Sequence, residues 1–422
     1  MSTRSLLLPL FCLLLISNAN AVVQVVSDGT ATDRTADLQA AIDTAYANGD
    51  MVEIVGRVYV EDHIYLYGNV SLVGVGTLLL NDNPTYGSYW IVTGGKHYGS
   101  TGGDVVPWTG KIEGLTIKCT SLVTANVNLI NLCVTDGGAI KDCNFDLRYS
   151  PAKIGGIVGL NNANFVNGGS FLRKNVKIRG NVMLAKQKSG GLNAIQLTFC
   201  STAWISDNYI EGFGNDGIVL SDTTDFTISE NNIQTPKGRI WLSSCQRGVV
   251  RGNIIKRVPD YDGVTTSNGG MIWVSLDNAS APSPSDITIE NNCIVHATAL
   301  NTTTQGIYVA GARRCKILNN IILDSSGYGR AIRVTPQQKT GWSDPENLEA
   351  DNISRVRHVE VIGNTAASPL ASGTCNGTME EYSTSALGNA AGVPGPCIWA
   401  GNRAGVGGVT TIGRDTVRGY LD

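Results

Sequence analysis

The chain is short of charge, proline and histidine, and each shortage excludes a class of protein. Charged residues make up 16% of its 422 positions, and it has only 13 Pro and four His. Little charge and little Pro argue against disorder and against a coiled coil. Four His leave little material for a metal centre built on several imidazoles. The formal net charge of −3 offers no basic field for nucleic acid, so we expect no nucleic-acid partner.

Long hydrophobic runs are missing beyond the first residues. Residues 6–16 form an apolar run of 11 residues, too short to span a bilayer, and Ala19-Asn-Ala21 has the small-x-small pattern of a cleavage site. This predicts a secretory signal peptide over residues 1–21, a secreted, extracellular protein, and no membrane partner. A membrane anchor is the alternative interpretation of the same segment.

The cysteines are not arranged for metal binding or redox chemistry, because no C-x-x-C motif occurs. Ten Cys are present and nine remain once Cys12 leaves with the signal peptide, so at least one is unpaired. Cys375 and Cys397 bracket a Gly-rich segment and form the predicted disulfide. In a eukaryote, glycans are expected on the sequon residues Asn69, Asn278, Asn301, Asn352 and Asn376.

Glycine is plentiful, at 50 residues, and a short pattern recurs along the chain. The pattern is apolar-x-x-Asn-x-apolar, as in Ile228-Ser-Glu-Asn231-Asn-Ile233. Two early copies, starting at Ile112 and Ile140, lack the Asn. The shortest spacing is the 22 residues from Ile228 to Val250, so longer spacings indicate loops inserted into a constant unit. The Asn positions are Asn181, Asn208, Asn231, Asn253, Asn292, Asn320 and Asn364.

An apolar-x-apolar segment, such as Ile218-Val-Leu220, stands ten residues before five of these copies. Ten residues are too few for a strand-to-strand crossover helix. The two features together predict a right-handed parallel β-helix, with one 22-residue unit per rung and rungs about 4.8 Å apart. We expect the Asn amides to bond from rung to rung, and the Asn backbone to adopt the left-handed conformation that a bend needs.

The N-terminal segment predicts a cap for the open end of this stack. Thr35 is expected to cap an amphipathic helix that stops at Gly49. Its apolar face would be Leu38, Ala41, Ile42 and Ala45. The predicted organisation is a signal peptide (1–21), an N-terminal cap with the first rungs (22–75), a parallel β-helix (76–366) and a C-terminal cap segment (367–422).

Four early segments carry a resemblance to a known superfamily. They are Asp28-Gly-Thr30, residues 35–43, Gly56-Arg-Val-Tyr59 and residues 70–75. Together with the Asn-bearing rungs, they resemble the pectin-lyase-like right-handed parallel β-helix proteins. That superfamily includes polysaccharide lyases, glycoside hydrolases, epimerases, tailspike depolymerases and noncatalytic adhesins. The resemblance therefore implies the fold and leaves the activity open.

Alternation along the apolar-x-apolar strands predicts a row of outward side chains. Aromatic rings in that row can stack on sugars, and an Arg can grip a carboxylate or a sulfate. Loops near residues 256–268, 277–286 and 336–357 would wall a cleft. The alternatives are rings packed under these loops or a homotrimer interface, so the protein is expected to be a monomer or a homotrimer. The outward residues are Asn131, Gln196, Val219, Trp241, Trp273, Tyr308 and Arg333, of which Gln196, Trp241, Trp273, Tyr308 and Arg333 are the predicted substrate-binding residues.

The segment Asn215-Asp216-Gly-Ile218 is similar to the Asn-x-Asp-Gly-Ile strand of polygalacturonase-type hydrolases. By that resemblance Asp216 falls on a catalytic carboxylate, but Lys237-Gly238 stands where the next rung of that family supplies two more Asp. Hydrolysis needs two carboxylates. Turns or loops could supply the second one, from Asp222, Asp225, Asp260, Asp262 or Asp277.

Elimination from a uronic acid needs a base and a cation instead. Lys237, Arg239 and Arg333 are the cations near the row; Lys237 would need a lowered pKa to act as base. Tyr308 and His296 are candidate proton shuttles. No cofactor is certain, but a lyase could use Ca²⁺, held by Asp216, Asp222 and Glu230.

The sequence thus predicts a secreted carbohydrate-active protein that cleaves a polysaccharide. Elimination is slightly preferred over hydrolysis, because the second Asp rung is missing. The alternative is a noncatalytic β-helix that serves as an adhesin, a glycan-binding protein, a surface coat or a spike.

Overall fold

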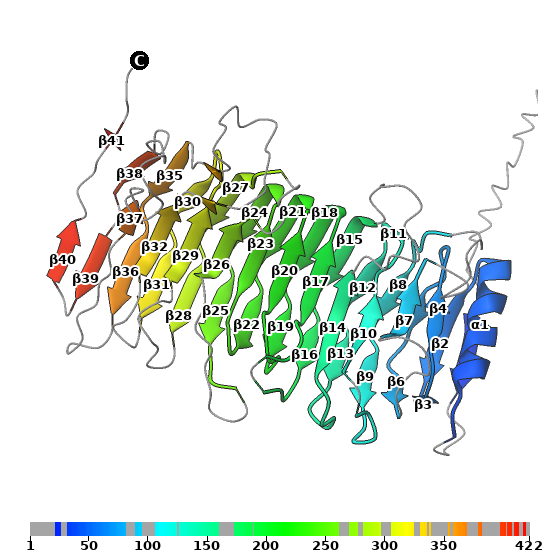
Figure 1. Ribbon diagram of the computed structural model, residues 1–422. Helices are drawn as coiled ribbons and strands as arrows, with labels where there is room; N and C mark the ends of the chain where they lie inside the picture. Colours follow the sequence, from blue (N-terminus) through cyan, green and yellow to red (C-terminus); the bar gives the residue numbers. More distant parts are fainter. Residues whose placement is uncertain are drawn as a thin grey trace, which may run out of the picture.

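A computed structural model describes most of the chain (Figure 1). The described residues are 22–26, 32–81, 89–94, 106–124, 126–159, 173–188, 190–260, 270–276, 282–296, 305–324, 330–335, 337–338, 353–354, 358–368, 379–381, 397–401, 403–406, 409–412 and 417–418. The predicted signal peptide lies outside them. No helix within these ranges is long and apolar enough to cross a membrane.

Strands of three sheets make up almost all of the described chain. Sheet A contains β1 (Val22–Val26), β2 (Met51–Val55), β5 (Leu72–Val73), β8 (Lys111–Glu113), β12 (Ala139–Lys141), β15 (Arg173–Arg179), β18 (Cys200–Ser206), β21 (Thr224–Ser229), β24 (Gln246–Arg251), β27 (Ser285–Glu290), β30 (Lys316–Leu318), β35 (Val359–Ile362), β38 (Cys397–Ala400) and β41 (Val417–Arg418), with β11 (Thr135–Asp136) beside β15. Sheet B contains β3 (Arg57–Val60), β6 (Thr77–Leu80), β9 (Thr116–Cys119), β13 (Asn144–Asp146), β16 (Val182–Leu184), β19 (Tyr209–Glu211), β22 (Asn232–Thr235), β25 (Ile254–Arg257), β28 (Cys293–His296), β31 (Ile321–Asp324), β36 (Thr365–Ser368), β39 (Arg403–Val406) and β40 (Val409–Ile412). Sheet C contains β4 (Ile64–Leu66), β7 (Tyr89–Thr93), β10 (Val127–Asn131), β14 (Ile154–Gly159), β17 (Ile195–Thr198), β20 (Ile218–Ser221), β23 (Ile240–Ser243), β26 (Gly270–Ser275), β29 (Gln305–Ala310), β32 (Arg330–Thr335) and β37 (Met379–Glu381). A separate antiparallel pair joins β33 (Gln337–Gln338) to β34 (Ile353–Ser354).

Each rung takes one strand from each sheet, in the order C, A, B. The rung β20–β21–β22 is followed by β23, and Ile218 pairs with Ile240 in parallel, 22 residues later. In Figure 1 the rungs follow one another from the helix at one end to the C-terminal strands at the other. The repeat length and the parallel pairing confirm the predicted parallel β-helix. The sheet B strand is the element that the sequence pattern did not separate, although its inward residue is the last apolar position of the pattern.

The interior of the stack is apolar because every strand turns alternate side chains inward. On one rung Ile218, Leu220, Ile228 and Ile233 are fully buried, and the same positions are apolar on the neighbouring rungs. Burying each such side chain stabilises the fold by about 1.5–3 kcal/mol.

The seven Asn form one buried ladder between sheets A and B. Each Nδ2 donates to the Oδ1 of the next Asn at 2.9 Å, from Asn181 through to Asn364. The same Oδ1 also accepts the backbone N–H of the preceding Asn, as Asn231 does from Asn208 at 3.1 Å. Cys143 continues the column, since its N–H donates to Asn181 at 3.0 Å. The predicted ladder is confirmed.

The left-handed residue of this bend is not the Asn itself, which corrects one expectation. The positive φ angle belongs to the residue immediately before each of the seven Asn, and before Leu115 and Cys143 in the two copies that lack the Asn. These residues are Gly114, Asp142, Gly180, Asp207, Glu230, Gly252, Asn291, Asn319 and Gly363. The preceding residue therefore turns the chain, and the Asn side chain then bonds along the stack.

An α-helix, α1 (Thr35–Asn48), lies at the N-terminal end of the stack, as Figure 1 shows. Its buried face includes the predicted Leu38, Ala41, Ile42 and Ala45. The helix ends at Gly49, which has a φ of 75°. Thr35 is the first helical residue and Arg34 holds the cap position, with no capping bond from its side chain. Asp33 Oδ1 accepts the Thr35 backbone N–H at 2.9 Å and the Thr35 hydroxyl at 2.5 Å.

The parallel stack continues beyond the predicted boundary at Ala366. Strand β38 pairs in parallel with β35, and β39 pairs in parallel with β36. Strands β40 and β41 then pair antiparallel with β39 and β38. Cys397 lies in β38, but Cys375 lies outside the described residues, so this disulfide stays a prediction.

Seven other cysteines in the described part of the chain form no disulfide, and all but Cys293 are buried. Burial raises the pKa of the Cys133 thiol to about 11 and that of Cys200 to about 12, so these thiols are protonated at neutral pH. Asn69 lies in an exposed turn. The other sequon residues, Asn278, Asn301, Asn352 and Asn376, lie outside the described residues.

Candidate functional site

The predicted outward row lies in register along sheet C. Pairing runs from Asn131 through Val158, which the sequence pattern missed, and then to Gln196, Val219, Trp241, Trp273, Tyr308 and Arg333. Asn131, Val158 and Val219 are buried, whereas Gln196 and the last four residues are half-buried. The part of the row that reaches solvent is therefore its C-terminal half, together with Gln196.

Trp241, Trp273 and Tyr308, here called the aromatic row, stack on one another. The two Trp ring centroids are 5.3 Å apart with 14° between the planes, and the Trp273 and Tyr308 centroids are 5.9 Å apart. Trp241 Nε1 donates to Ser275 Oγ at 2.9 Å. The sequence predicted flat rings displayed outward, and the structure shows rings that use part of their area on one another.

Arginines lie against the aromatic row at two places. The Arg239 guanidinium is 4.7 Å from the Trp241 centroid and 4.8 Å from the Trp273 centroid. The Arg333 guanidinium is 5.5 Å from the Tyr308 centroid. Contacts of this kind between a cation and a ring contribute about 0.5–2 kcal/mol each. They fix Arg239 between the rings and the neighbouring carboxylate.

That carboxylate belongs to Asp216, which binds Arg239 in a bidentate pair. Arg239 Nε and Nη2 donate to the two Asp216 oxygens at 2.6 and 2.7 Å, and both residues are buried. Asp216 comes just before β20 and Arg239 just before β23, so the pair joins adjacent rungs. The turn before β23 requires Gly238, since its φ is 50° and a Cβ there would lie 2.9 Å from the Arg257 backbone.

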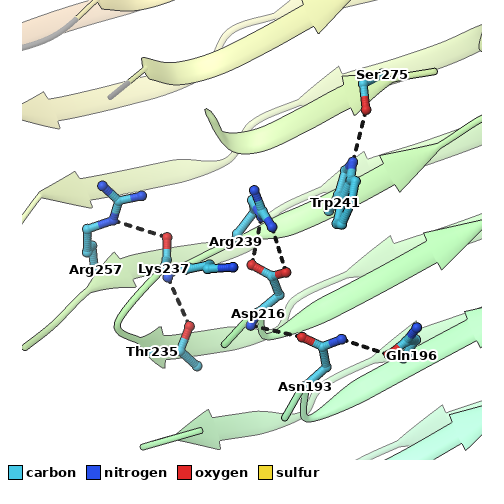
Figure 2. Close-up of polar contacts among 10 residues, drawn as sticks. Asn193, Gln196, Asp216, Thr235, Lys237, Arg239, Trp241, Arg257 and Ser275 are labelled. Atoms are coloured by element: carbon cyan, nitrogen blue, oxygen red, sulfur yellow. Dashed lines mark hydrogen bonds and ion pairs between the residues drawn. The ribbon is translucent and has the colours of Figure 1, made fainter. Parts of the chain in front are cut away.

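Two more cations complete what we call the cationic corner, made of Lys237, Arg239 and Arg257 around Asp216 (Figure 2). Arg257 is fully buried at the end of β25, and its Nε donates to the Lys237 carbonyl at 3.1 Å. Lys237 is half-buried, and in Figure 2 its side chain extends toward Asp216 and Arg239. Three cations thus share one carboxylate where sheet B turns into sheet C.

Burial and mutual repulsion act on the proton affinities in this corner. The pKa of Lys237 is lowered by burial above all; Asp216 raises it, and Arg239 and Arg257 lower it further. Burial also lowers the pKa of Arg257 to about 10, with Arg239 acting in the same direction, so Arg257 remains charged at neutral pH. The corner can therefore attract an anion, and Lys237 gives up its proton more readily than an exposed lysine.

Gln196 is connected to the corner through a residue that the sequence reasoning missed. Asn193 Oδ1 accepts the Asp216 backbone N–H at 3.1 Å, and its Nδ2 donates to Gln196 Oε1 at 2.7 Å. Arg257 was also missed. The feature that could have pointed to Arg257 is its place in register with Thr235, at a position that is buried in both rungs and therefore unusual for a charged residue.

Asp222, one of the five residues predicted as a possible second acid beside Asp216, does not join the cationic corner. Asp216 precedes β20 and Asp222 follows it, so a whole strand, about 20 Å of extended chain, separates them. Glu230 lies at the third bend of the same rung, before Asn231. The three carboxylates considered as calcium ligands therefore do not come together. In the described ranges, no three His, Cys, Asp or Glu side chains lie close enough to hold a metal ion.

The other candidate acids also lie away from the corner or outside the described residues. Asp225 pairs with Arg247 at 2.7 and 2.8 Å on the exposed surface. Asp260 is half-buried in the segment after β25. Asp262 and Asp277 lie outside the described residues, as do most of the loops expected to wall a cleft. His296 lies in β28, and its side chain is not among those described.

The buried Asp216–Arg239 pair predicts a large stability effect. Asp216→Asn removes the charge opposite a buried guanidinium, so we expect the free energy of unfolding to fall by about 3 kcal/mol or more. Urea unfolding monitored by circular dichroism measures it. The exposed, equally bidentate pair offers a matched control, since Asp225→Asn should lose less than about 1 kcal/mol. Equal losses in the two variants would contradict the assigned burial.

Comparisons with known proteins identify the fold. The family model described as the right handed beta helix region matches residues 155–336, which include the cationic corner and the aromatic row. The chain is a right-handed parallel β-helix. The predicted resemblance to the pectin-lyase-like superfamily is thereby confirmed at the level of the fold. No curated protein matches the sequence.

Several solved structures match this chain at low sequence identity. A mutant of the DFA-IIIase from Arthrobacter chlorophenolicus A6, in complex with DFA-III, is 10% identical with a TM-score of 0.55, over 90% of this chain and 92% of that one. The A-module of the Azotobacter vinelandii mannuronan C-5 epimerase AlgE4 is 17% identical with a TM-score of 0.42, over 80% of this chain and 85% of that one. The tailspike of E. coli bacteriophage HK620, in complex with a pentasaccharide, is 12% identical with a TM-score of 0.47, over 82% of this chain and 74% of that one.

Proposed function

We propose that this right-handed β-helix is a secreted enzyme that binds an acidic polysaccharide along sheet C and cleaves it by β-elimination beside a uronic acid. The observation that carries the proposal is the position of Arg239. It contacts both Trp rings of the aromatic row and binds Asp216 within the cationic corner. A sugar lying on the row would therefore place its substituents next to three cations. The predicted signal peptide would deliver the protein to an extracellular polymer.

The aromatic row and the corner suit the two halves of an acidic sugar. The half-buried rings of Trp241, Trp273 and Tyr308 offer apolar area to the C–H groups of a pyranose. The excess cationic charge around Asp216 offers a partner for the carboxylate. Gln196, held by Asn193, supplies an amide to hydroxyl groups on the other side of the corner.

Elimination requires removal of the proton alpha to the uronate carboxylate. In the proposed reaction the Lys237 amine takes the proton from C5, the electron pair forms the C4–C5 double bond, and the bond from C4 to the departing oxygen breaks. That oxygen takes a proton from water, and Lys237 returns its own to solvent. The cations of the corner stabilise the negative charge that grows on the carboxylate in the transition state. The lowered pKa of Lys237 makes its neutral form accessible.

Hydrolysis has less support in this geometry. Both oxygens of Asp216 accept hydrogen bonds from Arg239 inside a buried pair, so this carboxyl group is not placed to protonate a leaving oxygen. Hydrolysis with two carboxylates also needs a second one across the bond, within about 10 Å. Asp222, one of the five candidates for the second acid, lies beyond the far end of β20.

A noncatalytic glycan-binding protein, such as an adhesin, a surface coat or a trimeric spike, is the second candidate. The observation that favours it is that the side chains of the cationic corner already bond to other protein groups. Arg239 donates to Asp216, and Arg257 donates to the Lys237 carbonyl. Such a protein would bind the polymer and leave it intact.

Turnover and binding together distinguish the two candidates. The purified protein is incubated with pectate, alginate and glycosaminoglycans, while ultraviolet absorbance records unsaturated products and calorimetry records binding. We expect one acidic polymer to yield unsaturated products that absorb ultraviolet light, and we expect the Trp241→Ala variant to bind that polymer more weakly. Binding without product from any polymer would favour the adhesin, and new reducing ends without absorbance would show hydrolysis.

A further inference from the structure

A second surface with sugar-binding chemistry lies on the outer face of sheet A. Strand β15 presents three exposed cations, Lys174, Lys177 and Arg179. Strand β18 beside it presents Trp204, which is 40% exposed. We call these four residues the sheet A patch. None of them belongs to the aromatic row or to the cationic corner.

Register places the ring among the cations. Lys177 pairs with Trp204, Arg179 with Ser206, and Lys174 with Ser201. The Lys177 Nζ lies 5.6 Å from the centroid of the Trp204 ring. On the other side Trp204 pairs with Thr227, a short side chain that leaves the ring open. An exposed indole of this size has no structural task in the stack, because the core side of β18 is already filled by Ala203 and Ile205.

The three cations of the patch also lack acidic partners. Among the described residues, no carboxylate lies within salt-bridge distance of Lys174, Lys177 or Arg179. The nearest basic neighbours do have one, since Glu113 binds both Lys111 and Lys141. The acids next to the patch are Asp136, Asp142 and Asp207. Asp136 is in register with Lys174 and accepts from Asn175 at 2.9 Å, and the other two lie in the bends. Unpaired cations along one strand are unexpected in a chain whose net charge is −3.

We propose that the sheet A patch is a second binding surface for an acidic polysaccharide. The inference rests on the proposed function only in taking the same class of polymer. Anionic groups of the chain would lie along Lys174, Lys177 and Arg179, and one sugar ring would stack on Trp204. Lys177 and Arg179 are two apart on the strand, so their side chains stand about 6.5 Å apart, a spacing that a chain of charged sugars can match. Lys174 lies beyond Asn175, where the strand bends at a φ of 53°. Charge complementarity selects the acidic polymer, and the ring selects a sugar over a simple anion.

The sheet A patch and the proposed active site lie on different sheets of the β-helix. Trp204 is on sheet A, whereas the aromatic row is on sheet C and the cationic corner lies where sheet B turns into sheet C. The patch would therefore tether the enzyme to a long polymer without touching the bond that is cleaved. Its loss should weaken binding of long chains and leave short substrates unaffected.

Two variants of the full-length protein test the patch. One is Trp204→Ala, and the other is the double change Lys177→Ala with Arg179→Ala. Calorimetry with pectate and alginate, each as a polymer and as a short oligosaccharide, should show about fivefold weaker binding of the polymer for either variant. Arg57→Ala, an exposed cation on sheet B, is the matched control and should bind as the unaltered protein does. Because all these residues are exposed, the unfolding midpoints should agree.

The outcomes separate this inference from the proposed function. Weaker polymer binding by the patch variants supports the patch, even if no polymer is ever cleaved. Unchanged polymer binding by both variants overturns the patch, even if elimination is observed. Equal loss of binding for neutral dextran, or duplex DNA bound as tightly as the acidic polysaccharide, would also overturn the chosen partner.

Discussion

Lys237→Ala should reduce turnover of the acidic polymer by about 10²-fold or more, the usual range for loss of a positioned base. The substrate should still bind, because the aromatic row and the other two cations remain. The loss should therefore fall mainly on kcat rather than on KM. Measurement of both constants from the rate of unsaturated product checks the expectation.

The pH profile gives an independent signature of the same lysine. Burial lowers the pKa of Lys237, and the base form is the neutral amine, so kcat should rise as the pH increases through that pKa. Lys237→Arg keeps the charge but stays protonated, so it should be as inactive as the alanine variant. Lys256→Ala, on the neighbouring outward position of β25, is the control and should keep the original profile. An active Lys237→Arg variant would contradict the assigned role.

Asn231→Ala should lower the free energy of unfolding by about 3 kcal/mol or more, the largest stability loss we expect from a single amide. Its Oδ1 accepts two bonds from Asn208, at 3.1 and 2.9 Å, and its Nδ2 donates to Asn253 and to the Ile205 carbonyl. Each of these partners is buried: the Asn208 backbone N–H would lose its acceptor, and the Asn208 Nδ2, the Asn253 Oδ1 and the Ile205 carbonyl would each lose one bond. Each unsatisfied group costs about 1–3 kcal/mol.

Urea unfolding measures this loss, and the chain supplies a matched control. Asn144 is an exposed Asn at the start of β13, outside the ladder, and its change to Ala should alter stability by less than about 0.5 kcal/mol. A loss for Asn231→Ala no greater than that of the control would show that the ladder is not a main source of stability.

The fold could be predicted because the recurring Asn has a structural role that can be deduced from its chemistry. A buried amide at one position of seven successive rungs satisfies polar groups that the bend leaves behind, so the same Asn recurs with the bend. The conformation of the bend could not be assigned to the right residue by the same reasoning. The left-handed residue before the Asn varies among Gly, Asp, Glu and Asn, and so leaves no constant signal.

The placement of the candidate site residues was predictable where it depended on alternation along strands. Trp241, Trp273 and Tyr308 follow from register alone, and Lys237 and Arg239 from their places before the next strand. Arg257 and Asn193 were not found, because they reach Lys237 and Asp216 from neighbouring rungs by contacts that sequence distance does not encode. Asp222 was considered as a partner for Asp216 because the two are close in sequence. The extended strand between them places them at opposite ends of β20.

The central claim is that the cationic corner receives the carboxylate of a sugar that lies on the aromatic row. The most direct measurement is a crystal structure of the Lys237→Ala variant with an acidic oligosaccharide of the polymer that the protein cleaves or binds. We expect a sugar ring against Trp241 or Trp273, with its carboxylate directed toward the cationic corner. An oligosaccharide absent from sheet C, or bound there with its carboxylate turned away from the corner, would contradict it.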